Sequence, residues 1–432
     1  QLGLTVALIE ADKIGGTCLH RGCVPTKAIL HSAETAEAVR EAASVGVNAV
    51  FQGLDMPAVQ KYKNGVVSRM HKGLEGLVAS RGIEVVRGWG RLVARDTVEV
   101  NGRRYRGRNI VLASGSFSKT IGQEISGPVM TSDQALELDR VPSSAVILGG
   151  GVIGVEFASA WASMGSRVTI IEGLPRLVPN EDEAVSKQLE RAFRKRKIAF
   201  KTNTMFESVE RTATGVTVRT ADSKTYDAEV LLIAVGRGPA TANLGYEEAG
   251  VAMDRGFVLT DDYGRTNVDG VWAVGDIVPG VQLAHRGFAQ GIVVAEKIAG
   301  LDPRPVDDTL VPKVTFCEPE IASVGLSEAQ AIEIHGAEKV TTAEFNVAGN
   351  AKSQILGTQG FVKLVSLKDG PVVGFHAIGT RMGEQIGEGQ LIVSWEADAH
   401  DVASLVHAHP TQNETIGEAA MALAGKPLHN HG

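Results

Sequence analysis

The sequence predicts an α/β protein that contains two nucleotide-binding units and a separate C-terminal α+β domain. Three observations support this prediction. Residues 146–172 read as a strand, a glycine-rich turn, a helix and a second strand that ends in an acid. Parts of this unit recur earlier in the chain, and the glycine clusters thin out beyond about residue 311. We therefore expect two Rossmann-like domains followed by a domain of mixed strands and helices.

The composition is that of a folded globular protein with more than one domain. The chain has 432 residues, of which 44% are hydrophobic and 22% are charged, and these values exclude a disordered or fibrous protein. A chain of this length is expected to form two or three domains. The net charge of −7, with both signs interspersed, argues against nucleic acid or an anionic membrane as the main partner.

The glycine-rich turn of the later unit has the pattern of a dinucleotide site. Gly149, Gly151 and Gly154 fit G-x-G-x-x-G, which lets backbone amides at a helix start approach a pyrophosphate. Glu172 ends the following strand, where an acid binds a ribose 2′-hydroxyl and favours NAD over NADP. Arg176 lies close enough to keep NADP as an alternative, although we interpret it as a solvated loop charge. A purely structural glycine turn is the other alternative.

The repeats show that the earlier unit is a second copy of this pattern. Residues 2–10 resemble residues 164–172, and residues 109–116 resemble residues 230–237. The earlier copy starts where a helix ends and shows neither a first strand nor a glycine turn. We therefore expect that some tens of residues precede Gln1 in the complete protein, and such a segment could carry a targeting signal.

Two of the three cysteines, Cys18 and Cys23, lie in a stretch that the later copy lacks. A regular helix through both would place them ~7.5 Å apart along its axis, too far for a disulfide, but Gly22 permits a bend. Pro25 suits the first turn of a helix, which puts Cys23 at a helix N-terminus where the dipole favours a thiolate. Lys27, one turn later on the same face, adds positive charge.

Several interpretations of this cysteine pair stay open at this point. A structural disulfide, two buried thiols and a metal site are the alternatives, and His20 is the only further zinc ligand nearby. The flanking nucleotide-binding units favour a redox disulfide. The third cysteine, Cys317, matches no motif and is interpreted as a small core residue.

Residues 15–27, Gly-Gly-Thr-Cys-x4-Cys-x-Pro-x-Lys, resemble the redox-active motif of the pyridine nucleotide–disulfide oxidoreductases. The resemblance covers the whole chain. Residues 109–116 are similar to the family's Ala-Thr-Gly segment, with Ser114 in place of Thr, and residues 266–276 to the strand whose Asp contacts the FAD ribitol. The match is closest to members that oxidise dihydrolipoamide, and it implies an enzyme that passes electrons through a disulfide and FAD to NAD⁺.

The resemblance also implies an organisation and a set of partners. The expected domains are an FAD-binding part (1–120), an NAD-binding domain (121–243), a return to the central FAD domain (244–310) and a dimerisation domain (311–432). The implied partners are a second copy of the chain and the lipoyl domains and acyltransferase of 2-oxo acid dehydrogenase complexes, with no nucleic acid, membrane or metal. The expected location is the cytoplasm. The alternatives are a glutathione-reductase-like member, which Glu172 disfavours, and a non-catalytic redox-responsive scaffold.

The same resemblance assigns roles to individual residues. Cys18 would form the mixed disulfide with the substrate, Cys23 would face the flavin, and Lys27 would pair with Glu156. The implied FAD contacts are Glu10, Gly16, Thr17, Lys27, Gly90, Ser114, Gly115, Ser116, Asp276, Gln282, Leu283, Ala284 and His285. The implied NAD contacts are Gly149, Gly150, Gly151, Val152, Ile153, Gly154, Glu156, Glu172 and Gly236.

The segment His-Ala-His-Pro-Thr-Gln-Asn-Glu at 407–414 is the most distinctive feature of the last hundred residues. Taken alone, a histidine near a carboxylate is more often a surface pair than a catalytic dyad. The family resemblance instead favours a catalytic dyad, in which His409 is the base and Glu414 orients its ring. In the family this base reaches across a two-fold axis into the partner's disulfide site. His407 is one residue off the pattern and is interpreted as a neighbour.

Overall fold

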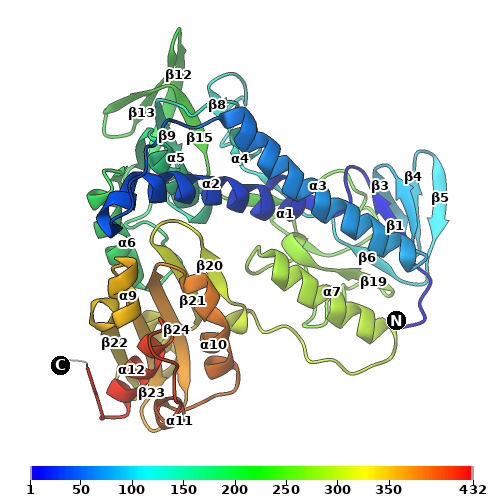
Figure 1. Ribbon diagram of the computed structural model, residues 1–432. Coiled ribbons are helices and arrows are strands. Elements are labelled where there is room, and N and C mark those ends of the chain that lie inside the picture. Colours follow the sequence, from blue (N-terminus) through cyan, green and yellow to red (C-terminus); the bar gives the residue numbers. More distant parts are fainter. Residues whose placement is uncertain (1, 430–432) are drawn as a thin grey trace.

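The computed structural model describes residues 2–429 of the chain (Figure 1). The outer ends of the predicted first and last domains, residue 1 and residues 430–432, lie outside the described part. In Figure 1 the N-terminal and middle regions form the upper part of the molecule, and the C-terminal region lies below the middle one. None of the helices within residues 2–429 is both long enough and apolar enough to cross a membrane.

The N-terminal region consists of long helices and several small sheets. Its helices are α1 (Gly16–Arg21), α2 (Cys23–Glu41) and α3 (Met56–Ser80). The strands are β1 (Ala7–Glu10), β2 (Glu84–Arg87), β3 (Gly90–Ala94), β4 (Thr97–Val100), β5 (Arg103–Arg106), β6 (Ile110–Leu112) and β7 (Ser116–Ser118). β1 pairs in parallel with β2, and β3, β4 and β5 form an antiparallel sheet.

The middle region is built on a five-stranded parallel sheet with the order β11-β10-β9-β15-β8. Its strands are β8 (Val129–Met130), β9 (Ser144–Leu148), β10 (Arg167–Ile171), β11 (Ala199–Lys201) and β15 (Val230–Ile233). The helices are α4 (Ser132–Ala135), α5 (Val152–Met164) and α6 (Glu183–Lys195). An antiparallel sheet of β12 (Phe206–Thr212), β13 (Gly215–Thr220) and β14 (Thr225–Ala228) joins it, and β16 (Arg237–Pro239) pairs with β7. The apolar, largely buried strands are typical of a parallel sheet covered on both faces.

The two copies predicted from the sequence correspond strand by strand. β10 and β15 both pair with β9, and their counterparts in the first copy are β1 and β6. β1 pairs with β2, and β6 pairs with β19 (Val271–Ala273), so these strands form two separate two-stranded sheets. Within residues 2–429, no strand takes the place between β1 and β6 that β9 takes between β10 and β15.

The chain then returns to the first region and ends in an antiparallel domain. The returning elements are β17 (Met253–Asp254), β18 (Phe257–Val258), β19 and α7 (Ala284–Ile298). The final sheet, β20-β21-β24-β23-β22, consists of β20 (Lys313–Thr315), β21 (Glu320–Gly325), β22 (Val340–Asn346), β23 (Phe361–Leu367) and β24 (Val372–Gly379). Its helices are α8 (Glu328–His335), α9 (Ala351–Leu356), α10 (Met382–Ser394), α11 (Ala399–Ala403) and α12 (Glu414–Leu423).

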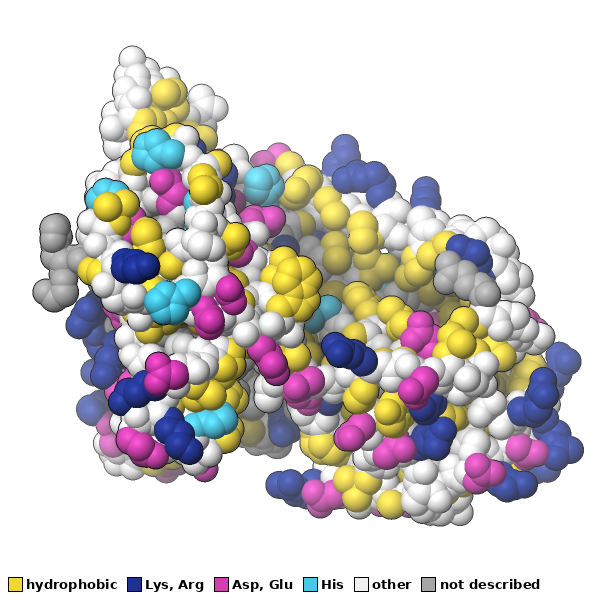
Figure 2. All heavy atoms as spheres, turned by 90° about the horizontal axis from the view of Figure 1, so that it is seen from below, with side chains coloured by type: hydrophobic (Ala, Val, Ile, Leu, Met, Phe, Trp, Pro, Cys, Tyr) yellow, Lys and Arg dark blue, Asp and Glu magenta, His cyan; other side chains and the backbone are white. Residues whose placement is uncertain are grey.

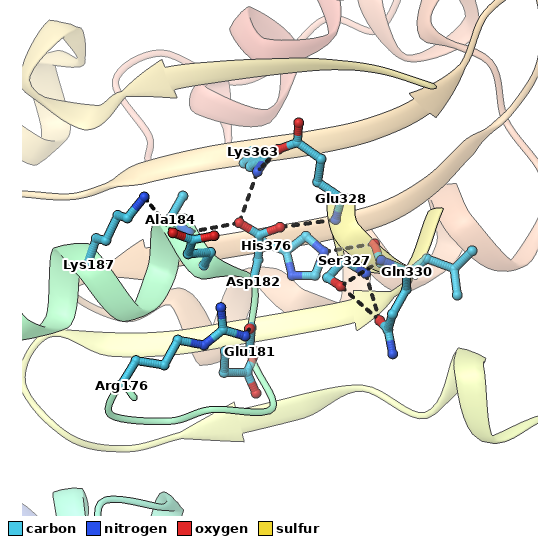
Figure 3. A network of polar contacts seen from close by, with 12 residues as sticks. Arg176, Glu181, Asp182, Ala184, Lys187, Ser327, Glu328, Gln330, Lys363 and His376 are labelled. Carbon is cyan, nitrogen blue, oxygen red and sulfur yellow. Dashed lines mark hydrogen bonds and ion pairs between the residues drawn. The ribbon is translucent and has the colours of Figure 1, made fainter. Parts of the chain in front are cut away.

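A buried polar network fastens the middle region to the last domain (Figure 3). Lys363 of β23 donates to Asp182 (2.9 Å) and to Glu328 (2.6 Å), and the backbone N–H of Glu328 donates to the other oxygen of Asp182. His376 of β24 lies beside this network and is buried. Because each charge has a partner, these groups tolerate burial between the two parts.

The largest hydrophobic core also joins separate regions. It includes Ile29 and Ala33 of α2, the buried face of α5, and Cys317 and Ile321 of the last domain. Cys317 is only 1% exposed, which confirms its interpretation as a small core residue. On the face seen in Figure 2, Lys and Arg side chains are interspersed with Asp and Glu, as expected of a chain that does not present one continuous charged field.

Candidate functional site

The two cysteines of the motif lie on successive helices separated by a break at Gly22. Cys18 belongs to α1, and Cys23 is the first residue of α2. Gly22 has φ −141° and ψ −115°, and a Cβ there would meet the carbonyl oxygen of Thr17 at 3.0 Å. The predicted bend is therefore confirmed. It brings the two sulfurs close enough for a hydrogen bond between the thiols.

The two sulfurs differ in how readily they ionise. The Cys18 thiol hydrogen-bonds to the Cys23 sulfur, and together with the positive charge of Lys27 this lowers the pKa of Cys23 to about 7, although partial burial opposes the effect. The same hydrogen bond and burial raise the pKa of Cys18. The start of α2 adds a favourable dipole for a negative sulfur. The structure therefore favours a thiolate at Cys23 and a thiol at Cys18.

Lys27 forms an ion pair with Glu156 beside the cysteines. The Lys27 Nζ lies 2.9 and 2.8 Å from the two carboxylate oxygens of Glu156, whose side chain is 3% exposed. The N–H of Phe316 donates to the same carboxylate at 2.9 Å, and the Phe316 ring lies 4.8 Å from Lys27 Nζ. These contacts hold α2, α5 and the segment after β20 together, so the charge near Cys23 has a fixed position.

The glycine turn between β9 and α5 fits a pyrophosphate. A Cβ on Gly149 would overlap the carbonyl of Ala234, and one on Gly154 would overlap the carbonyl of Gly149, so both positions require glycine. Gly151 faces open space, and it provides no side-chain cap for α5. The first N–H groups of the helix, from Val152 onward, are therefore suited to bind phosphate oxygens. The helix begins at Val152, inside the G-x-G-x-x-G segment.

Glu172 lies next to this turn, at the end of β10. Its carboxylate accepts hydrogen bonds from the N–H groups of Gly150 (2.5 Å) and Leu174 (2.7 Å), a placement that suits an acid directed at a ribose. Arg176 is half-buried and donates to the carbonyls of Pro179 and Glu181, at 2.8 and 3.0 Å. The interpretation of Arg176 as a solvated charge was therefore wrong. Its guanidinium is bound within its own loop.

The residues expected to contact FAD fall into two groups. Glu10 ends β1, where burial raises its pKa against the opposing effect of Arg87, and it accepts a hydrogen bond from the N–H of Asp12. Ser116 donates to Asp276 at 2.5 Å, and Arg237 donates to the Ser116 hydroxyl at 2.7 Å. Ser114, which stands where the family's Ala-Thr-Gly segment has Thr, accepts a hydrogen bond of 3.2 Å from the Tyr246 hydroxyl.

Three of the remaining expected FAD contacts are glycines. Gly16, which precedes Thr17 in α1, and Gly115 have positive φ with open space where a Cβ would lie, and Gly236 of the second copy has the same property. Gly90 packs against Ile9, next to Glu10.

The segment Gln282-Leu283-Ala284-His285 leads into α7. Leu283 gives this helix no side-chain cap, Gln282 donates to the carbonyl of Asp276 at 3.2 Å, and His285 contacts the carbonyl of Pro312. The contact of these residues with the sugar and ribitol parts of FAD stays a prediction. Within the described residues, the first copy has no glycine turn equivalent to the one between β9 and α5.

The C-terminal histidine motif forms a separate group. His409 Nδ1 lies 2.8 Å from Glu414 Oε1, the His409 side chain is 72% exposed, and the N–H of Thr411 donates to the other carboxylate oxygen. None of the contacts among residues 2–429 joins His409 to Cys18 or Cys23, and Figure 1 places α12 far from α1. The structure thus forms the His409–Glu414 pair but does not bring it to the cysteines of the same chain.

Sequence reasoning missed two groups of polar residues around these sites. Arg196 follows α6 and donates to Ser159, Ser163 and Glu37, which ties α2 to α5. Glu388 of α10 binds His407, which the sequence marked only as a neighbour. Arg196 directly after α6 and Glu388 within α10 are both far in sequence from their partners, so no local pattern could have identified them.

The chain is similar to known proteins over almost its whole length. Residues 1–291 match the model of the pyridine nucleotide-disulphide oxidoreductases, and residues 311–420 match the dimerisation domain of the same group. A protein named dihydrolipoyl dehydrogenase from Bacillus subtilis is 35% identical over 99% of this chain and 95% of its own length. One from Geobacillus stearothermophilus is 37% identical over 99% and 93%.

Two solved structures have the same overall fold. LpdA from Mycobacterium tuberculosis superimposes with a TM-score of 0.89 at 25% identity, over 97% of this chain and 94% of that one. The HOCl-induced flavoprotein disulfide reductase RclA from Escherichia coli gives a TM-score of 0.86 at 28% identity, over 97% and 94%. The predicted fold class, two dinucleotide-binding domains and a dimerisation domain, is confirmed.

Proposed function

The chain belongs to the pyridine nucleotide-disulphide oxidoreductases, and on that premise we propose that it oxidises dihydrolipoamide to lipoamide with FAD and NAD⁺ as cofactors. The observation that carries the proposal is the charge arrangement at Cys18 and Cys23, in which the hydrogen bond from the Cys18 thiol and the charge of Lys27 lower the pKa of Cys23 to about 7. The substrate would arrive on the lipoyl domain of a 2-oxo acid dehydrogenase complex.

The charge arrangement determines which sulfur the substrate attacks. In the oxidised enzyme, a substrate thiolate would attack Cys18 and break the Cys18–Cys23 bond, because Cys23 has the lower pKa and is the better leaving group. The second substrate thiol would then attack the mixed disulfide and release lipoamide and the Cys18 thiol. When bound, FAD takes the electron pair from the reduced cysteines and passes it to NAD⁺ as a hydride. Lys27 stabilises the charge on Cys23, and Glu156 keeps Lys27 in place.

His409 would act as the base that deprotonates the substrate thiol. Its Nδ1 is occupied by Glu414, so Nε2 is the nitrogen available to take the proton. The separation of this pair from the cysteines of its own chain supports a shared site in which His409 serves the disulfide of a second copy. The match of residues 311–420 to a dimerisation domain supports the same arrangement. We therefore propose a homodimer with two composite sites.

Single substitutions test the disulfide mechanism. Cys23→Ser is expected to abolish NAD⁺-dependent oxidation of dihydrolipoamide, whereas Cys317→Ser, which changes a buried thiol outside the site, should keep most of the rate. Full turnover by Cys23→Ser would overturn the proposed function. A scaffold without catalysis predicts no turnover by the unmodified protein.

Mixing inactive variants tests the shared site. Dimers re-formed from Cys23→Ser and His409→Gln chains contain one composite site with both groups intact. They should recover about a quarter of the unmodified rate, because half of the dimers in a random mixture are mixed and each has one intact site of two. No recovery in dimers shown to be mixed would contradict action across the two-fold axis.

A further inference from the structure

A second histidine–glutamate pair lies beneath the loop that carries His409. His407 Nε2 lies 2.7 Å from Glu388 Oε1, and the two side chains are 12% and 24% exposed, in contrast to the 72% exposed His409. His407 also packs against Gly417 of α12, where an added Cβ would lie 2.8 Å from the imidazole Nδ1. The ring of His407 therefore occupies a fitted space between α10 and α12.

Glu388 holds the loop at two points. Its second oxygen accepts a hydrogen bond of 2.7 Å from the Asn413 side chain, and Asn413 immediately precedes Glu414. A single carboxylate on α10 thus binds residues 407 and 413, which flank His409. His409 is largely exposed, and within residues 2–429 its side-chain hydrogen-bond partner is Glu414, so the placement of its ring depends on how the loop is held.

We propose that His407 and Glu388 are positioning residues for the His409 base, which they serve by fixing the loop that carries it. This inference rests on the proposed function, in which His409 takes the proton from the substrate thiol. A base that must reach a sulfur from an exposed loop loses rate when its position spreads over even an ångström. The pair reduces this spread without touching the substrate.

His407 and Glu388 each favour the charged form of the other. The hydrogen bond to Glu388 raises the pKa of His407, and Glu414 raises it further. The bonds from His407 and Asn413 lower the pKa of Glu388 despite its burial. The charged His407 also helps to keep the pKa of Glu414 low. Glu388 from α10 and Glu414 from α12 are the charged groups that face His407.

Steady-state kinetics on the FAD-loaded enzyme tests the proposal. His407→Gln and Glu388→Gln should each lower kcat for dihydrolipoamide about tenfold and leave KM within about twofold. The rate of ferricyanide reduction by NADH, which requires no thiol deprotonation, should not change. His400→Gln, an exposed histidine on α11 of the same domain, is the matched control and should behave as the unmodified enzyme. The double variant should be no slower than the slower single variant, because the two changes remove the same interaction, the one between His407 and Glu388.

The comparison of the two activities adds a readout that general loosening would not produce. Loss of positioning slows only the step that needs the His409 base, whereas a loosened domain would also slow the reduction of ferricyanide by NADH. An unchanged kcat for dihydrolipoamide, or an equal fall of both activities, would overturn the proposal. If turnover is lost in His409→Gln but normal in His407→Gln and Glu388→Gln, the positioning role is overturned while the proposed function stands. An unmodified enzyme with no dihydrolipoamide turnover would overturn both.

Discussion

Replacing Lys27 or its partner Glu156 should move the ionisation of Cys23 in opposite directions. Lys27 lowers the pKa of Cys23 and Glu156 raises it, while their ion pair at 2.8–2.9 Å keeps both groups in place. These effects together lower the pKa of Cys23 from 9.0 to about 7, which leaves about half of the sulfur as thiolate at pH 7. The hydrogen bond from Cys18 is the largest contribution, and the charge of Lys27 is a smaller one in the same direction.

Lys27→Gln should therefore raise the pKa of Cys23 above about 7, so its thiolate fraction at pH 7 should fall below about one half. Glu156→Gln should increase the thiolate fraction, because the charge of Glu156 raises the pKa of Cys23. The assay is the rate of alkylation of the reduced enzyme by iodoacetamide between pH 5 and 10, with the Cys23 peptide quantified by mass spectrometry. Equal shifts in the same direction for both variants would refute this account of the charges.

Three further predictions concern the domain junction and the nucleotide turn. Lys363→Met leaves Asp182 buried without its cation and should lower the free energy of unfolding by about 3–5 kcal/mol in urea titrations. Glu328→Gln changes a side chain that is 43% exposed and should cost only about 1 kcal/mol. Equal losses in the two variants would contradict the role of Lys363 as the partner of a buried charge. Burial lowers the pKa of His376, so the unfolded state binds the proton more tightly than the folded state does. The melting temperature measured by calorimetry should therefore fall as the pH drops through 6.5. His376→Asn should remove that part of the pH dependence. Glu172→Gln should raise KM for NAD⁺ about tenfold with kcat within about twofold, and an unchanged KM would contradict the ribose role.

The parts of this molecule that the sequence predicts are those encoded by neighbours along the chain. The glycine turn before α5, the acid at Glu172 and the break at Gly22 each depend on local backbone conformation, which glycine and proline determine directly. The same holds for the two copies of the nucleotide-binding unit, because a repeat is visible without any knowledge of contacts.

Contacts between distant segments could not be predicted in this way. Asp182 and Lys363 are far apart in sequence, and each alone reads as an ordinary surface charge, yet both are buried where two regions meet. Arg176 was misjudged for a related reason, since the carbonyls that bind it belong to a loop whose path a sequence does not reveal. His407 acquires its importance only from Glu388, a residue of α10 with no motif around it.

The most direct test of the account is anaerobic reduction of the oxidised, FAD-loaded enzyme with one equivalent of dihydrolipoamide. The account predicts a long-wavelength absorption band from the Cys23 thiolate next to the flavin, followed by stoichiometric NADH when NAD⁺ is added. The band should be absent in Cys23→Ser and should fade as the pH falls below about 7, where Cys23 takes up a proton. A flavin that is fully reduced without the band, or NADH formation that persists in Cys23→Ser, would contradict the central claim that electrons pass through Cys18 and Cys23.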